Sequence, residues 1–356
     1  MNELTIAVAG ARKTQGIVDS CASPNGRRIL VLALTQANQH ELATRIKSAN
    51  PLAENVEILG WYSFLLRHFI RPYLPLLFAG RRLNGFNYEG EPGRYASGED
   101  RYFDNEGRAY QRYLASLACK VHEASQGSVV DRLEHIYTDI YIDEAQDIGG
   151  WSLEVLDILF ASKLDVHLVG DMRQALISTD PRDRKHRQFK AEKVIDWYRI
   201  RERKNVLAIK EQNYTYRSNQ VIADLSDRVF DPSHGYSATI SYCTETNAHS
   251  GLFRVHPSDV AEYFSLFQPL CVHWRSDLGR QHDLPYITFG KSKGLTTEHV
   301  LILPTAKFKA FLKDGTYLDG RTACSFYVGV TRAIHSAAFI LDKNDVAPGL
   351  QQWLPG

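Results

Sequence analysis

Residues 136–147 read Ile-Tyr-Thr-Asp-Ile-Tyr-Ile-Asp-Glu-Ala-Gln-Asp, a β-prone apolar run followed at once by an acidic turn. The run predicts a buried strand over residues 136–142. In open parallel sheets ligands bind at the carboxyl ends of strands, which makes Asp143 and Glu144 candidates to face a ligand. One carboxylate there can hold Mg²⁺ through oxygen, and its neighbour can orient and deprotonate a water. The alternative is an acidic turn that caps the helix after it.

Strands and helices alternate on both sides of this stretch. The sequence predicts strands over 4–9, 29–34 and 166–169, and helices over 14–21, 36–48 and 152–160. This alternation favours an α/β fold with parallel sheets covered by helices on both faces.

A length of 356 residues suits two domains. We expect a first domain over residues 1–205, interrupted at about 60–135 by a helical insertion with apolar stretches at 61–77 and 108–124. A second α/β domain follows over 206–356. Its buried strands are expected at 270–273, 300–303 and 337–341.

The composition is that of a folded globular protein, with 44% hydrophobic and 23% charged residues. No apolar run approaches the ~20 residues that a membrane span needs, and the first residues lack a signal-peptide pattern. We therefore expect a soluble, cytoplasmic protein with no membrane partner. The five cysteines form no Cys-x-x-Cys pair, which argues against disulfide scaffolds and structural zinc. A net charge of +1 means that nucleic-acid binding would need local patches.

Residues 9–14, Ala-Gly-Ala-Arg-Lys-Thr, lie between a predicted strand and a predicted helix. Lys13 and Thr14 stand in the order of a phosphate-binding loop, but Arg12 takes the place of a glycine and the loop is about two residues short. Backbone N–H groups at the helix start can cradle phosphate, Lys13 can neutralise its charge and Thr14 can reach Mg²⁺. A basic turn at a helix N-terminus is an equally good interpretation.

Further polar segments follow later strands: Gly-Asp-Met-Arg-Gln at 170–174, Gln-Asn-Tyr-Thr-Tyr-Arg-Ser-Asn at 212–219, Lys-Gly-Leu at 293–295 and Tyr-Val-Gly-Val-Thr-Arg-Ala at 327–333. An isolated Arg in such a segment is most often a surface or ion-pair residue.

In this order, the segments resemble the motifs of superfamily 1 DNA helicases of the UvrD/Rep/PcrA type. The resemblance spans nearly the whole chain and includes Thr-Gln-Ala at 35–37 and Trp-Tyr-Ser-Phe at 61–64. Its most specific parts are Asp-Glu-Ala-Gln-Asp at 143–147, Gly-Asp-x-x-Gln at 170–174 and Val-x-Val-Thr-Arg-Ala at 328–333.

The resemblance implies two RecA-like P-loop domains that close on ATP with Mg²⁺. The nucleotide would be held by Gly10, Ala11, Arg12, Lys13, Thr14, Tyr216 and Gly294, with Tyr216 stacked on adenine. Thr14 and Asp143 would bind the metal, Glu144 would activate water and Gln174 would sense the γ-phosphate. Arg217 and Arg332 would stabilise the charge on the transferred phosphoryl group, as arginine fingers do.

By the same resemblance, Thr35, Ser63 and Phe64 would contact single-stranded or partly duplex DNA. A basic stretch could add phosphate contacts, and a solvated connector is an equally good interpretation. Its members are Arg182, Arg184, Lys185, Arg187, Lys190 and Lys193.

The sequence therefore predicts an ATP-dependent DNA helicase or single-stranded DNA translocase. Only 75 residues separate Arg217 from Lys293, too few for the large helical insertion of the family's second domain. That small size leaves open a regulatory subunit that binds nucleotide and gates a partner nuclease, as in anti-phage defence systems of the Gabija type. The irregular loop at 9–14 leaves open a third interpretation, a DNA-binding scaffold that no longer uses ATP.

Overall fold

The computed structural model describes residues 1–51, 54–179, 184–245, 247–275 and 282–355. The chain divides into two compact units. Unit 1 comprises residues 1–5, 13–170 and 178–210, and unit 2 comprises residues 6–12, 171–177 and 211–356. Two short segments at the ends of strands of the first sheet thus belong to the second unit: 6–12, which includes the last two residues of one strand, and 171–177, which follows another.

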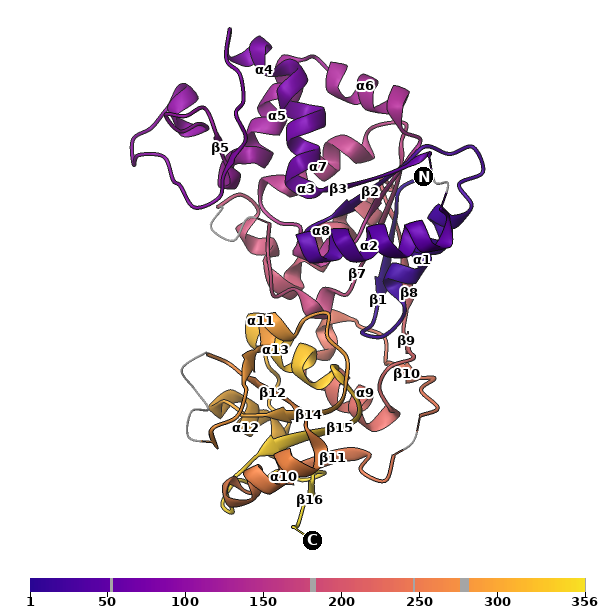
Figure 1. The fold of residues 1–356 in the computed structure, drawn as a ribbon, viewed down its shortest axis with the longest axis vertical. Coiled ribbons are helices and arrows are strands. Elements are labelled where there is room, and N and C mark those ends of the chain that lie inside the picture. The colour runs from indigo at the N-terminus through magenta and orange to yellow at the C-terminus, as the bar shows by residue number, and fades with distance from the viewer. Residues whose placement is uncertain (52–53, 180–183, 246, 276–281, 356) are drawn as a thin grey trace. The chain divides into compact units, whose positions relative to one another are not determined.

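Unit 1 is built on a six-stranded sheet in the order β3-β2-β6-β7-β1-β8 (Figure 1). Strand β2 pairs in parallel with β3 and β6, and β6 pairs in parallel with β7. The strands are β1 (Glu3–Ala7), β2 (Ile29–Ala33), β3 (Val56–Gly60), β6 (Asp139–Ile142), β7 (Asp165–Gly170) and β8 (Ala208–Gln212).

Strand β2 is covered on both faces, because all five of its side chains are buried. Ile29, Val31 and Ala33 pack in one cluster with apolar residues of helices α1 (Lys13–Ala22) and α2 (Gln36–Ala49). Leu30 and Leu32 alternate with them and are equally buried. A central strand of aliphatic residues between helical layers is typical of a parallel α/β sheet.

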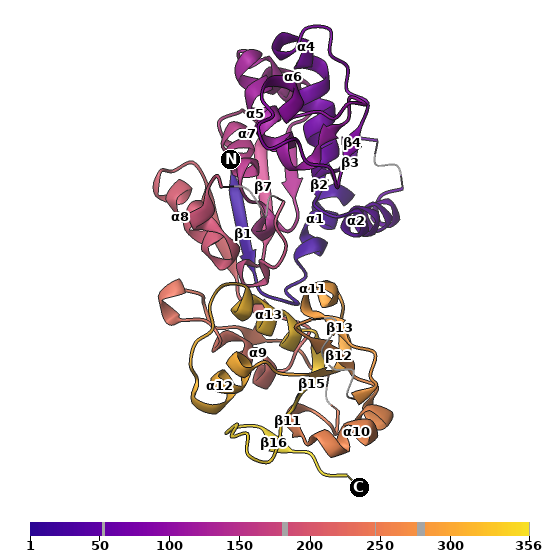
Figure 2. The same cartoon turned by 90° about the vertical axis from the view of Figure 1, so that its left-hand side faces the viewer.

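Helices of the insertion lie together at one end of unit 1 in both views (Figures 1 and 2). They are α3 (Trp61–Phe64), a π-helical stretch (Leu65–Ile70), α4 (Arg71–Leu77), α5 (Leu114–Ala124) and α6 (Ser128–Ile136). Between α4 and α5 run two short paired strands, β4 (Phe86–Asn87) and β5 (Ala109–Tyr110). Helices α7 (Trp151–Phe160) and α8 (Val194–Arg203) complete the unit.

Unit 2 contains a second six-stranded sheet, in the order β13-β12-β14-β15-β11-β16, in which every neighbouring pair is parallel. A two-stranded sheet, β10-β9, precedes it. The strands are β9 (Tyr214–Thr215), β10 (Ile240–Ser241), β11 (Gly251–Val255), β12 (Leu270–His273), β13 (Ile287–Thr288), β14 (Thr297–Ile302), β15 (Ala333–Ile340) and β16 (Gln351–Gln352).

Helices cover both faces of the second sheet. Val300 and Ile302 belong to one core cluster with residues of α9 (Gln220–Asp227), α12 (Ala306–Asp314) and α13 (Gly320–Val330). Leu301, which lies between them, belongs to another cluster with residues of α10 (Val260–Phe267). The two-residue period of a strand accounts for this separation of neighbours. Helix α11 (Phe289–Ser292) also belongs to this unit.

The predicted fold class is confirmed: the chain is mixed α/β with two parallel sheets, as expected of two RecA-like domains, and the first carries a small helical insertion. Four predicted elements were wrong at their starts. The strands expected at 300–303 and 337–341 begin earlier, at Thr297 and Ala333. The strand predicted from residue 136 begins at Asp139, because residues 128–136 form the amphipathic helix α6. The helix predicted from residue 108 begins at Leu114, after the short strand β5.

Within the described ranges, every helix is too short or too polar to cross a membrane.

Gly10 permits residues 6–12 to pack against the start of the 211–356 segment. Its φ is +79°, and a Cβ there would lie 2.5 Å from Thr215 Oγ1 and 2.6 Å from Arg217 Cβ. The Gly10 carbonyl accepts a hydrogen bond from the Tyr216 amide at 3.1 Å. Only glycine meets both the steric and the dihedral requirement at this position.

We predict that Gly10→Ala destabilises unit 2 by about 2 to 4 kcal/mol, through left-handed strain and overpacking. Gly16→Ala is the control, because Gly16 is an exposed residue of α1 whose added Cβ would meet nothing within 4 Å. That change should stabilise the protein by about 0.5 to 1 kcal/mol. Denaturant midpoints measure both effects, and equal midpoints for the two variants would contradict the packing described here.

Candidate functional site

Thr14 and Asp143 come together at the carboxyl ends of strands in unit 1. Thr14 lies in the first turn of α1, and Asp143 directly follows β6. The Thr14 hydroxyl donates to Asp143 Oδ2 at 3.4 Å, and the Asp143 carboxylate is 3% exposed. Hydroxyl and carboxylate oxygens are the hard ligands that Mg²⁺ prefers, so these residues fit the metal.

No group of three or more His, Cys, Asp or Glu side chains in the described part of the chain is arranged to hold a metal. A Mg²⁺ ion at Thr14 and Asp143 would thus depend on water or substrate oxygens for its other ligands, as is usual for this ion.

Glu144 has a strained backbone conformation. Its φ and ψ are +59° and +43°, in the left-handed region that non-glycine residues seldom adopt. The Glu144 amide donates to Asp143 Oδ1 at 2.9 Å, and the Gln146 side-chain amide donates to the Glu144 carboxylate. Strain of this kind costs of order 1 to 3 kcal/mol and concentrates at functional sites. Here it accompanies a half-buried carboxylate held beside Asp143.

The loop before α1 is a tight turn in which the Ala11 amide donates to the Val8 carbonyl at 3.2 Å. Ala11 is buried, whereas Arg12 is exposed and has a φ of +60°. Lys13 is the first residue of α1, where backbone N–H groups have no acceptors within the helix. The phosphate-binding role of residues 10–14 stays a prediction, in which the amides at the start of α1 would be the donors to the anion.

Two side chains contact the ring of Tyr216. The Arg12 guanidinium carbon lies 4.2 Å from the centre of the Tyr216 ring, a cation–π contact within unit 2. Tyr216 also stacks on Tyr242 with ring centres 5.8 Å apart, and the two rings are 39% and 56% exposed. A base that stacked on Tyr216 would meet these two side chains.

Asp171 is the centre of a buried polar network in unit 2. Its carboxylate is 1% exposed and accepts from Tyr327 Oη at 2.9 Å and from Gln174 Nε2 at 2.9 Å. Arg173 donates to Asp171 from its amide at 3.2 Å and to Asp227 Oδ1 at 2.6 Å. Burial opposes the charge of Arg173, but the carboxylates of Asp171 and Asp227 act against this, and the pKa of Arg173 is raised.

Arg332 and Arg217 adjoin the same network. Arg332 is 1% exposed and donates to Gln174 Oε1 at 3.4 Å and to the Leu295 carbonyl at 3.3 Å. Arg217 is half-buried and donates to the Thr331 carbonyl at 3.1 Å, and burial lowers its pKa. Unit 2 thus brings Gln174, Arg217 and Arg332 together. Gly294 is exposed with a φ of +88° and precedes Leu295.

Thr35 and Ser63 follow neighbouring strands at one edge of the first sheet. Strands β2 and β3 pair in parallel with Ala33 opposite Gly60, which places the starts of α2 and α3 side by side. Thr35 Oγ1 caps α2 by accepting from the Asn38 amide at 3.2 Å, and Ser63 is exposed. Phe64, however, is fully buried against Trp61, His68 and Phe69. A base could stack on it only after the insertion repacked.

In the basic stretch, Lys185 Nζ lies 3.1 Å from Glu154 Oε1 and over the Trp151 ring. Arg182 lies outside the described residues.

Four network residues were not selected from the sequence: Asp171, Tyr327, Arg173 and Asp227. Tyr327 and Arg173 lie inside the quoted motifs, but nothing local indicates that the Tyr327 hydroxyl accepts from the Ala9 amide at 3.0 Å while it donates to Asp171. Burial raises the pKa of Tyr327 well above its ordinary value, which keeps this donor protonated. Asp227 is the last residue of α9 and carries no motif signal at all.

We predict that Tyr327→Phe destabilises unit 2 by about 1 to 3 kcal/mol, because it leaves the buried Ala9 amide and the Asp171 carboxylate each short of one partner. Tyr242→Phe, which removes a hydroxyl from a ring that is 56% exposed, should change stability by less than about 0.5 kcal/mol. Chemical denaturation followed by circular dichroism gives both values. A Tyr327→Phe protein as stable as the wild type would show that the network is not formed.

No protein-family model matches the chain, and no curated protein matches it. Among solved structures, the chain is similar to the arterivirus nonstructural protein 10 helicase, with 14% identity and a TM-score of 0.47 over 95% of this chain. The same helicase in complex with DNA gives 14% identity and a TM-score of 0.47 over 96% of this chain. The chain spans 59% and 61% of the length of these two proteins.

Proposed function

We propose that this protein hydrolyses ATP with Mg²⁺ and couples hydrolysis to movement along DNA, as a helicase or single-stranded DNA translocase. The observation that carries the proposal is the contact of Thr14 with Asp143 beside the strained Glu144. Nucleotide hydrolysis at a P-loop requires a hydroxyl, a buried carboxylate and a second carboxylate at strand ends.

In this proposal, the residues of unit 1 bind the phosphates and Mg²⁺ and activate the attacking water. Lys13 and the amides at the start of α1 bind phosphate oxygens. Thr14 and Asp143 hold Mg²⁺, which when bound neutralises charge on the phosphates. Glu144, oriented by Gln146, accepts the proton of the attacking water.

The residues of unit 2 would act on the same nucleotide. Gln174 would respond to the terminal phosphate, and Arg217 and Arg332 would stabilise the charge that develops on it. The hydrogen bond between Arg332 and Gln174 supports a shared role for the two side chains. Tyr216, together with Arg12, would bind the base.

Nucleic acid would bind at the sheet edge where Thr35 and Ser63 follow β2 and β3. Both side chains carry hydroxyls, which contact phosphate and sugar oxygens without selecting sequence. The proposed contact is limited to Thr35 and Ser63, because the Phe64 ring is buried against Trp61, His68 and Phe69.

Glu144→Gln should lower the rate of ATP hydrolysis by about 10²- to 10⁴-fold with little change in nucleotide affinity, because it removes the general base and keeps the shape. Lys13→Ala should weaken nucleotide binding itself. Steady-state phosphate release with and without single-stranded DNA measures the rate, and a fluorescent ATP analogue measures the affinity.

The matched controls are Glu123→Gln and Lys47→Ala, which alter exposed residues of α5 and α2. Both should hydrolyse ATP at the wild-type rate. A wild-type protein that hydrolyses no ATP under any condition would overturn the proposed ATP-driven movement along DNA. If that protein still bound ATP and copurified with a nuclease, the gating alternative would take its place.

Ser63→Asp should weaken single-stranded DNA binding several-fold and reduce the stimulation of hydrolysis, because it adds a negative charge where phosphate is proposed to lie. Ser48→Asp, at the last turn of α2, adds the same charge at another exposed position and should leave DNA affinity unchanged. Fluorescence anisotropy at two salt concentrations distinguishes the variants, and equal affinities would remove Ser63 from the interface.

A further inference from the structure

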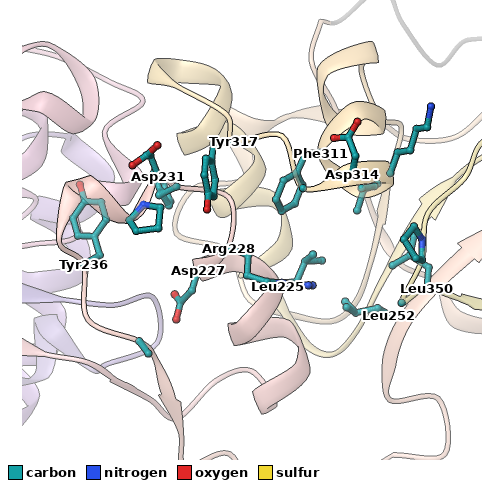
Figure 3. A pocket seen from close by; sticks show the side chains of 18 residues that line it. Leu225, Asp227, Arg228, Asp231, Tyr236, Leu252, Phe311, Asp314, Tyr317 and Leu350 are labelled. Carbon is teal, nitrogen blue, oxygen red and sulfur yellow. The ribbon is translucent and has the colours of Figure 1, made fainter.

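A pocket of about 630 Å³ opens in unit 2 among segments to which the proposed reaction assigns no role. Its walls come from the end of α9, the turn after it, the end of α12 and the segment 348–350 (Figure 3). The volume lies within the range of ~300 to 1,000 Å³ that small-molecule sites occupy.

The interior of the pocket is apolar and aromatic. Leu225, Leu252 and Phe311 are buried members of the unit 2 core that also line the pocket. Tyr317 lines it with a ring that is 51% exposed. Figure 3 shows Leu225 and Leu252 on one side of the pocket and Phe311 and Tyr317 on the other. Apolar surfaces on opposite sides suit a flat apolar group.

The three carboxylates of the wall are already satisfied by protein donors. Asp227 accepts from Arg173 and from the amide and hydroxyl of Thr239. Hydrogen bonds from Ser233 lower the pKa of Asp231, and hydrogen bonds from Thr316 lower the pKa of Asp314. In Figure 3 the carboxylates of Asp227 and Asp314 point away from the middle of the pocket.

Arg228 is a basic residue of the wall with an exposed side chain. Its amide closes the last turn of α9 by donating to Asp224, but its guanidinium makes no hydrogen bond or ion pair within the described ranges. In Figure 3 its side chain lies on the same side of the pocket as Leu225 and Leu252. A guanidinium beside apolar walls is complementary to a ligand that carries one anionic group on an apolar body.

The wall also touches the buried network of Asp171. Asp227 is held by Arg173, and the Arg173 guanidinium carbon lies 5.5 Å from the ring centre of Tyr236, another wall residue. Arg173 in turn contacts Asp171, which binds Gln174. A displacement of Asp227 at the end of α9 can therefore reach Gln174 through the contacts of Arg173 and Asp171.

We propose that this pocket binds a small molecule with a planar apolar body and a single anionic group, and that its occupancy alters hydrolysis through Asp227 and Arg173. The binding half is independent of the proposed function, whereas the regulatory half rests on it.

The probe for binding is 8-anilinonaphthalene-1-sulfonate, which joins an aromatic body to one sulfonate and fluoresces in apolar surroundings. The wild-type protein should bind it saturably at one site. Arg228→Gln should weaken binding about tenfold, as expected for the loss of a charged hydrogen bond. Tyr317→Ala should weaken it about threefold, through the loss of aromatic packing.

Two controls make the test specific. Arg321→Gln changes an exposed arginine of α13, and Tyr242→Ala changes an exposed tyrosine of the same unit, both outside the pocket. Neither should alter probe affinity. All four altered side chains are exposed, so the variants should fold, and thermal unfolding verifies this. The binding half is overturned by an Arg228→Gln protein that binds like the wild type, by full competitive displacement of the probe by Mg-ATP, or by the absence of saturable binding.

The regulatory half is tested on the ATP hydrolysis of the wild type and of Arg228→Gln. A saturating probe concentration should change the wild-type rate by about fivefold or more and leave the variant's rate unchanged. An unchanged wild-type rate refutes the coupling. A protein that binds the probe but hydrolyses no ATP refutes the proposed function and leaves the binding site in place.

Discussion

The carboxylate of Asp171 is 1% exposed, and a carboxylate is tolerated at such a depth only where hydrogen-bond donors surround it. Tyr327, Arg173 and Gln174 supply those donors from α13 and from the turn that carries Asp171 itself. Since a buried charge left with an open lone pair is costly, each donor is fixed in place by the requirement to satisfy this one group. This requirement fixes the position of Gln174. The hydrogen bond from Arg332 to Gln174 then fixes the position of Arg332 as well.

This constraint also explains why residues 6–12 and 171–177 belong to unit 2, although the first segment includes the end of β1 and the second follows β7. The Tyr327 hydroxyl binds Asp171 and the Ala9 amide at once, and Gly10 lets the loop approach Thr215 without a side chain between. The segment that carries the first half of the candidate phosphate loop is thereby held by side chains of unit 2, while Lys13 and Thr14 begin α1 in unit 1.

The two loops that carry the candidate phosphate-binding and catalytic residues each contain a residue with a strained backbone conformation. Arg12 and Glu144 both adopt left-handed conformations that their side chains disfavour. The strained conformation of Glu144 is accompanied by hydrogen bonds from Gln146 and to Asp143. The strained conformation of Arg12 is accompanied by stacking of its guanidinium on Tyr216. Strain that neighbouring contacts maintain keeps a side chain in one direction, which is what a group aimed at a ligand needs.

Local sequence determined the α/β class, the strands β2 and β12, and the carboxylates Asp143 and Glu144 after a buried strand, since apolar periodicity and turn residues act over a few positions. It did not determine the start of β6, where the amphipathic pattern of α6 runs directly into the strand. Tertiary structure alone decided the burial of Arg332 and Phe64 and the partners of Tyr327, which lie 156 and 318 positions away. Such pairings are chosen by packing between distant segments, and no local pattern encodes which segments meet.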